Sequence, residues 1–217
     1  MSKALLEHEA KQMLVDYNIP VLDFTFCESY DQLKSAAIQY GFPVVIKIVS
    51  PQIVHKSEAG GVKLNIKNEN ELRTAYDAML ESSKQYDPAA DIRGVLLSPF
   101  IPGGLEVIVG SVTDPQFGPV MMVGLGGIFV EIFKDVAFGV TPIDQREAME
   151  MLASLKAYPM LQGARGKAGT SLTMLSDLMV KLSHLIEEKS IVELDLNPIF
   201  CFPDHIMVAD ARLIVDE

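Results

Sequence analysis

Four short apolar runs follow one another between residues 94 and 133, and they constrain the fold more than any other feature. They read GVLLSPFI, LEVIVGSV, GPVMMVGL and IFVEIF, and turn residues of the Pro, Gly and Asp types separate them. Runs of this length predict β-strands, and such short connections favour antiparallel neighbours, since parallel strands need long crossovers. The second half of the chain is therefore predicted to contain a mainly antiparallel sheet.

The first half of the chain alternates helical and strand-like patterns. Helices are predicted at residues 3–17, 29–39 and 69–86 from their amphipathic spacing. Between them lie VLDFTF, PVVIKIVS and VKLNI, whose β-branched and alternating residues predict strands. These elements form a small α/β lobe, which we assign with the N-terminal helix to residues 1–95.

The second lobe is assigned to residues 96–217. Beyond the four runs it holds predicted helices at 145–156 and 171–188 and two final strands, IVELDLNPIF and HIMVADARLI. The fold class expected is α+β, with two α+β lobes. A hinge near SPFIPGG, residues 98–104, would place a cleft between them.

Composition excludes several classes of partner. The net charge is −11, which argues against general affinity for nucleic acid or anionic lipid, so any phosphate site must be local. No apolar run approaches the ~18 residues of a membrane span, and the N-terminus lacks a secretion signal. Cys27 and Cys201 have no metal or redox spacing and are interpreted as buried thiols. A cytoplasmic protein is expected.

Lys47 is the most informative charged residue of the first lobe. It interrupts the apolar run VVIKIV, where a charge is costly unless it is paired or faces a cleft. On a strand at the edge of a cleft, a lysine is suited to bind phosphate. The same pattern also fits a lysine on the solvent side of a half-exposed strand.

The loop VHKSEAGGV, which follows that strand, adds candidate phosphate contacts. Gly60 and Gly61 would let backbone N–H groups approach a phosphate, and Lys56 and Ser57 add donors. His55 is a candidate nucleophile, because a neutral imidazole beside a bound phosphate can accept it. A Gly-Gly turn between strands is also common for conformational reasons alone.

Acidic residues mark the second lobe. Glu106 begins the strand EVIVG, and Glu131 interrupts IFVEIF. Exposure on a solvent face would explain each of these two residues singly.

The final hairpin carries a clearer set of oxygen ligands. Glu193, Asp195 and Asn197 alternate along one strand and share a face, and Asp210 on the next strand could oppose Asn197. A small set of oxygen ligands suits Mg²⁺, which keeps waters and takes further ligands from nucleotide phosphates. A polar outer face of the hairpin is the alternative interpretation.

Two glycine-rich segments do not match nucleotide-binding motifs. GARGKAGT lacks the Walker spacing and a preceding strand, and GLGG does not fit the dinucleotide-binding pattern. Arg165 remains a candidate phosphate contact, or a residue that only caps a loop.

Taken together, the segments PVVIKIVSPQIVHKSEAGGV, LEVIVGSVTDPQFGPVMMVGLGGIFVE and ELDLNPIF with VADARL resemble the ATP-grasp domain of ADP-forming acetyl-CoA synthetases. They are more distantly similar to succinyl-CoA synthetase. The resemblance spans nearly the whole chain, and it implies a fold in which ATP or ADP with Mg²⁺ lies between two α+β lobes.

The resemblance also implies roles for individual residues. Lys47 would bind the phosphates, the Gly60-Gly61 loop would fold over them, and Glu106 would meet the ribose. The adenine would meet the hinge residues Ser98, Pro99 and Phe100, and the metal would be held by Asn197 and Asp210. His55 matches a histidine thought to relay a phosphoryl group to ADP.

In that family the acyl-CoA site belongs to an α subunit or a fused domain, which this chain lacks. The expected function is therefore that of the nucleotide-binding β subunit of an acid–thiol ligase. Two alternatives stay open: a carboxylate–amine ligase, which forms acyl phosphate directly, and a nucleotide-sensing module of an acyltransferase.

Overall fold

The computed structural model describes residues 2–127, 130, 132–164, 166, 168–216. By Cα proximity the chain divides into two compact units. The small unit is Leu22–Pro102, and the large unit combines Met1–Val21 with Gly103–Glu217. Each contains its own sheet and its own hydrophobic core.

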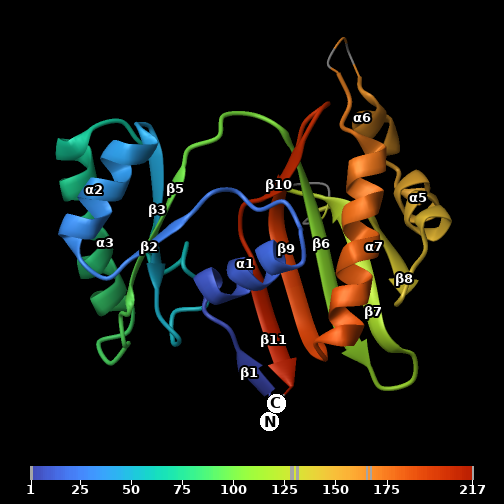
Figure 1. Cartoon of the computed structure of the whole chain (residues 1–217), viewed down its shortest axis with the longest axis horizontal. Helices are drawn as coiled ribbons and strands as arrows, with labels where there is room; N and C mark the ends of the chain where they lie inside the picture. The colour runs from blue at the N-terminus through green and yellow to red at the C-terminus, as the bar shows by residue number, and fades with distance from the viewer. Residues whose placement is uncertain (1, 128–129, 131, 165, 167, 217) are drawn as a thin grey trace. The chain divides into compact units, whose positions relative to one another are not determined.

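The small unit is a four-stranded antiparallel sheet with two helices on one face (Figure 1). Its strands are β2 (Thr25–Cys27), β3 (Val44–Val49), β4 (Val62–Ile66) and β5 (Gly94–Pro99), in the order β2-β5-β3-β4. Its helices are α2 (Tyr30–Tyr40) and α3 (Glu69–Tyr86). Alternate residues Val44, Ile46 and Ile48 of β3 pack against these helices.

The large unit is a seven-stranded sheet, and every pairing between its strands is antiparallel. The order is β1-β11-β9-β6-β7-β8, and β10 pairs with β9. These strands are β1 (Ser2–Ala4), β6 (Leu105–Asp114), β7 (Gly118–Leu125), β8 (Val136–Val140), β9 (Ile191–Cys201), β10 (Ile206–Val208) and β11 (Arg212–Asp216).

Four helices of the large unit share one core with the sheet. They are α1 (Glu7–Asp16), α5 (Gln145–Ser154), α6 (Tyr158–Gln162) and α7 (Leu172–Glu188). Their buried residues pack on one face of the sheet with alternate residues of the strands, such as Val109, Leu194 and Leu213. We call the opposite face of this sheet the outer face.

Side-chain caps fix where several helices begin. Ser29, Asn68, Asp144 and Ser171 each accept a hydrogen bond from the backbone N–H three residues later. Such a cap satisfies one of the N–H groups that the first turn leaves unpaired. The sequence therefore placed the starts of α2, α3, α5 and α7 within one or two residues.

The N-terminal segment does not belong to the small unit, in which the predicted boundary 1–95 had placed it. Residues 2–4 are not helical; they form β1, which pairs with β11. Helix α1 follows, and its Ala10 and Leu14 are fully buried in the core of the large unit. The division between the units falls at 102/103 instead of 95/96.

Three strand predictions also need correction. VLDFTF is a strand only from Thr25, and HIMVADARLI is divided into β10 and β11 by residues 209–211. IFVEIF lies partly outside the described residues, as does Glu131, and its described residues are not in a strand. The strand β8 follows instead, and its glycine-containing sequence VAFGV gave too weak a periodic signal.

Among the described residues, no helix combines the length and the apolar character needed to cross a membrane.

We predict that Leu14→Ala lowers the free energy of unfolding by about 2–5 kcal/mol, the usual cost of a cavity in a packed core. Leu14 is fully buried, whereas the neighbouring Val15 is 44% exposed on the same helix. Val15→Ala is the matched control and should cost well under half as much. Urea unfolding measures both, and equal losses would show that α1 does not pack as described.

Candidate functional site

The small unit presents Lys47 on the sheet face opposite α2 and α3. The register places Lys47 in a row with Phe26, Leu96 and Val62, across all four strands. Ser98 lies on the same face, opposite Val45. The alternative interpretation placed Lys47 on the solvent side of a half-exposed strand. In the structure this lysine is half-buried, and its neighbours are apolar.

The loop from residue 50 to residue 61 is closed by its own backbone. Gly61 donates its N–H to the Lys56 carbonyl at 2.7 Å and accepts from the Ile48 N–H at 2.8 Å. Gly60 donates to the Ser57 carbonyl at 3.1 Å. In this conformation, therefore, both glycine N–H groups are used within the loop.

Both glycines are required by space or backbone conformation. A Cβ on Gly61 would lie 2.5 Å from Ile48 Cγ2, and one on Gly60 would lie 2.9 Å from Ser82 Cβ on α3. Gly60 also has a φ of +64°, which side chains rarely adopt. The Gly-Gly pair thus fixes the loop against β3 and α3.

This fixed loop leaves its candidate side chains accessible. His55 and Ser57 are exposed, and Lys56 is half-buried. The backbone of His55 accepts a hydrogen bond from the Ala59 N–H at 3.2 Å, so the residue is part of the turn. An exposed imidazole on an ordered turn can meet a group that arrives from outside the unit.

The predicted hinge begins inside β5, with Ser98 and Pro99, and continues beyond it. Ser98 is buried and Pro99 half-buried at the end of the strand, and Phe100 donates its N–H to the Pro43 carbonyl at 3.0 Å. Gly103 and Gly104 then have φ values of +81° and +92°, and a Cβ on Gly104 would meet the Phe202 ring. The chain thus leaves the small unit through backbone conformations that glycine adopts more easily than other residues.

The large unit gathers Glu106, Asn197 and Asp210 on its outer face. The strand neighbours of Glu106 and Asn197, Val107 and Leu196, are buried in the core on the other face, and so is Ala211, which follows Asp210 between β10 and β11. The hairpin pattern had predicted Asp210 on a strand, but it lies in the segment 209–211 between β10 and β11. The flanking pairs Val208–Ile199 and Arg212–Asp195 bring this segment alongside residues 196–198 of β9, which include Asn197.

A β-bulge lies at this position. Between the pairs Val107–Ile199 and Val109–Leu196, two residues of β9, Asn197 and Pro198, oppose the single residue Ile108. Bulges re-aim side chains and are frequent beside binding sites. Asn197 is therefore roughly 7 Å along the strand from Glu106, at ~3.3 Å per residue.

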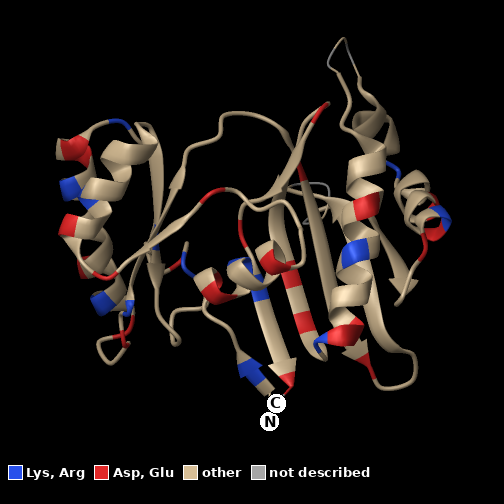
Figure 2. Cartoon of the chain, viewed as in Figure 1, with Lys and Arg blue, Asp and Glu red and all other residues tan. Residues whose placement is uncertain are grey.

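Strand β9 carries the acidic residues Glu193 and Asp195 a few positions before Asn197, and acidic segments lie along this strand in Figure 2. Burial, and then the charges of Asp210 and Glu193, raises the pKa of the Asp195 carboxyl, while Arg212 opposes the rise. Arg212 donates to the Glu193 carboxylate at 2.5 Å. The outer face thus brings several carboxylates together, with one cation on the neighbouring strand.

These oxygens fit Mg²⁺ bound with a nucleotide. Asn197 and Asp210 supply an amide and a carboxylate oxygen, the donor types that this cation prefers. Within the described ranges, no three His, Cys, Asp or Glu side chains are grouped so that they could hold a metal ion alone. The pair would need phosphate oxygens and water to complete the shell, which is the usual arrangement for Mg²⁺ with nucleotides.

Arg212 was not identified from the sequence as a residue of this site, whereas Arg165 was named as a candidate phosphate contact. Arg212 lies opposite Asp195, on the face that carries this carboxylate. The segment DARL contains this arginine two residues after Asp210, but only Asp210 was considered as a site residue. Arg165 lies outside the described residues. Both cysteines are free and buried as predicted, and burial raises the pKa of Cys27 to about 11 and of Cys201 to about 12.

A family described as the ATP-grasp domain has a model that matches residues 1–215. The β subunit of acetate–CoA ligase (ADP-forming) I from Pyrococcus furiosus is 48% identical over 99% of this chain and 93% of that protein. Acetate–CoA ligase (ADP-forming) II from Archaeoglobus fulgidus is 44% identical over 98% of this chain and only 30% of that protein.

Solved structures give the same likeness. Acetyl-coenzyme A synthetase 1 from Ca. Korarchaeum cryptofilum, in complex with coenzyme A, Ca-AMPCP and HgCl+, superposes with a TM-score of 0.94 and 44% identity, over 99% of this chain and 94% of that chain. Another structure of that protein contains coenzyme A and Mg-AMPPCP, with a phosphohistidine segment pointing towards the nucleotide-binding site; its TM-score is 0.83 and its identity 41%, over 99% and 93% of the two chains.

We predict that Asp195→Asn stabilises the chelator-treated protein at neutral pH. The pKa of Asp195 is raised in the folded state, so its stabilising contribution is present at low pH and is lost as pH rises through that pKa. The variant should therefore melt at a higher temperature than the wild type at pH 7, and the difference should shrink towards pH 4.

Asp177→Asn is the matched control, because Asp177 is exposed on α7. Its melting temperature should stay near that of the wild type at both pH values. A variant at position 195 that is less stable than the wild type at pH 7 would contradict the assigned crowding of charge.

Proposed function

Because the chain belongs to the ATP-grasp domain family, we propose that it is the nucleotide-binding subunit of an ADP-forming acyl-CoA synthetase. The overall reaction would convert acyl-CoA, phosphate and ADP to acid, CoA and ATP, reversibly. This chain would transfer the phosphoryl group between a histidine and ADP.

One structural observation carries this proposal: the segment with Asp210 runs alongside the part of β9 that holds Asn197, and the charge of Asp210 acts on Asp195. A charge-rich site of oxygen ligands suits a nucleotide–Mg²⁺ complex. The reaction itself is inferred from relatives named as ADP-forming CoA ligases, which match over nearly the whole chain and favour this function over a carboxylate–amine ligase.

The proposed contacts divide the nucleotide among chemically matched groups. The ammonium group of Lys47 would bind phosphate oxygens, and the carboxylate of Glu106 would accept hydrogen bonds from the ribose hydroxyls. Further contacts are proposed for Lys56, Ser57, Ser98, Pro99, Phe100 and Arg165. Gly60 and Gly61 would act by fixing the loop, since their N–H groups are already paired within it.

Asn197 and Asp210 would hold Mg²⁺, which when bound neutralises phosphate charge and orients the phosphates for transfer. Asp195 and Glu193 are weaker candidates, and Glu193 is already engaged by Arg212. The charge of Asp210 that disfavours ionised Asp195 in the metal-free protein would be offset by the cation.

His55 would carry the phosphoryl group. In the direction of ATP consumption, a ring nitrogen of neutral His55 would attack the γ-phosphorus, an N–P bond would form, and the bond to the β,γ-bridging oxygen would break. ADP would leave with the electron pair. The reverse step would regenerate ATP from ADP, and Lys47 would neutralise the developing charge in both directions.

The second half of the reaction requires a partner. The Pyrococcus relative is named as a β subunit, and the Archaeoglobus relative is a chain about three times as long as the part that matches. We propose that a CoA-binding α subunit, or the equivalent domain of a fused enzyme, carries the acyl-CoA site and exchanges the phosphoryl group with His55.

The metal assignment predicts a graded series of variants. Asn197→Ala and Asp210→Ala should raise the Mg²⁺ concentration needed for ADP binding by about tenfold or more, as loss of metal contacts commonly does. Asp195→Asn should have a smaller effect, and Asp177→Asn none. Calorimetric titration of ADP at several Mg²⁺ concentrations measures this, and equal effects at 195, 197 and 210 would refute the assignment.

The relay predicts a labelled histidine. Incubation of the subunit complex with Mg²⁺ and ATP labelled at the γ-phosphate should give a phosphate that is lost in acid and kept in base, as expected for phosphohistidine. His55→Ala should abolish the label on this chain but leave nucleotide binding nearly unchanged, because the phosphate contacts rest on other residues.

His184→Ala and His205→Ala are the matched controls. His184 is exposed on α7, and His205 lies in a turn, where it pairs with Asp204 and stacks on Phe202. Both variants should label normally. Normal turnover of the complex with Ala at position 55 would eliminate the relay.

A further inference from the structure

An exposed apolar strip crosses strands β6, β7 and β8 on the outer face of the large unit. The register sets Val112, Val120 and Val140 in one row, and Met122 and Phe138 in the next. Val112, Phe138 and Val140 are 58%, 65% and 51% exposed. We call these five residues the apolar strip; contiguous exposed apolar surface of this kind marks interaction sites.

The strip stands on a rigid support. A Cβ on Gly139 would lie 2.7 Å from Met151 Sδ and 3.3 Å from Ile143 Cγ2, so β8 packs directly on α5 and the residues before it. On its other side β8 pairs with β7 along all five residues. The exposed side chains therefore project from a fixed sheet, and binding would not have to order them first.

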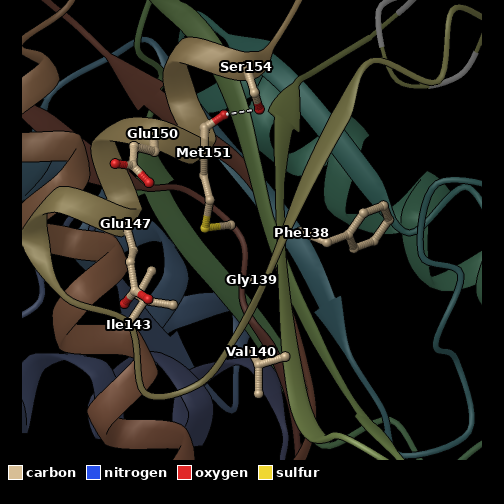
Figure 3. A pocket seen from close by; sticks show the side chains of 8 residues that line it. All are labelled: Phe138, Gly139, Val140, Ile143, Glu147, Glu150, Met151 and Ser154. Atoms are coloured by element: carbon tan, nitrogen blue, oxygen red, sulfur yellow. Dashed lines mark hydrogen bonds between the residues drawn. The ribbon is translucent and has the colours of Figure 1, made fainter.

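An acidic hollow lies behind the same strand. It has a volume of about 310 Å³ and is formed between β8 and α5. Figure 3 shows Glu147 and Glu150 on the α5 side, whereas Phe138 points away from them. The residues that line the hollow include two carboxylates and no lysine or arginine, so a cationic side chain would complement it.

The hollow and the strip flank an edge strand. Within the described part of the sheet, β8 is the last strand of the order. Its alternating residues point to opposite faces, so a segment lying along β8 would meet apolar groups on one side and carboxylates on the other.

Charge argues for a different partner and against a second copy of this chain. The chain has 29 acidic and 18 basic residues, so a copy would bring further negative charge towards Glu147 and Glu150. The fused relative from Archaeoglobus holds about 70% of its length outside the matching part, which shows that a large companion accompanies this domain there.

The apolar strip lies on the same sheet face as the proposed metal site, which favours the companion that exchanges the phosphoryl group. The row of Val112, Val120 and Val140 continues to Glu193, and the row of Met122 and Phe138 continues through Gly110 to Asp195. A partner bound on the strip would thus share the outer face with Asn197 and Asp210. Apolar contacts there would hold it beside the metal site without adding charge to that site.

We propose that the apolar strip and the acidic hollow are the docking surface for the CoA-binding partner, which presents apolar residues to the strip and a lysine or arginine to the hollow. This inference rests on the proposed function, because that function supplies the partner.

The test titrates the purified CoA-binding subunit into variants of this chain. Phe138→Ser combined with Val140→Ser should weaken the complex by about tenfold or more, as loss of central apolar contacts does. Glu150→Gln should weaken it by about threefold at low salt and reduce its salt dependence. Ile38→Ser, at a 54% exposed position on α2, is the matched control and should have no effect.

Binding of Mg-ATP by each variant checks that the fold and the nucleotide site are intact. If the complex forms and the strip variants bind as tightly as the wild type, the docking proposal is wrong while the proposed function stands. If those variants instead abolish self-association of this chain and leave the complex unchanged, the surface belongs to a second copy and the proposal is also wrong. If the wild-type chain binds nucleotide but no CoA-binding subunit, the partner half of the proposed function fails with it.

Discussion

The pairing of β9 with β6 is the constraint on which the large unit depends. Strand β9 lies inside the sheet, where it also pairs with β10 and β11. Its alternation buries Leu194, Leu196 and Ile199 in the core and sends Asp195 outwards. A shift of one residue would exchange the two sets and bury the carboxylates, so the register is fixed by the cost of burying charge.

The carboxylates on the outer face lower the stability of the folded chain when they are ionised. Asp195 is partly buried near Asp210 and Glu193, whose charges raise its pKa, and Arg212 on the adjacent strand opposes this rise and pairs with Glu193. Unfavourable arrangements of this kind are common at binding sites, where a ligand relieves them. The proposed cation would offset the repulsion between Asp195 and Asp210, and the bulge at Asn197–Pro198 lies on the same strand as Asp195.

The proposed metal site and the proposed docking surface lie on the same face of the large sheet. Two rows run without a break from the carboxylates of β9 to the exposed apolar residues of β8. Polar and apolar parts of one rigid surface can thus divide the work of binding a nucleotide and holding a companion subunit. In the small unit, the Gly60-Gly61 turn performs a comparable structural task, because it fixes the loop that carries His55.

The sequence by itself determined the local elements and much of the candidate site. Helix α3 and strand β4 were predicted with their observed ends. The sequence also indicated that Asp210 and Asn197 lie on neighbouring segments, although residues 209–211 interrupt the predicted strand. Only the tertiary structure decided that β1 pairs with β11, that β9 joins β6, and that the Gly61 N–H is used inside its own loop. Periodicity and turn residues report on neighbours within a few positions, whereas strand partners and the satisfaction of backbone donors depend on segments that lie far apart in the sequence.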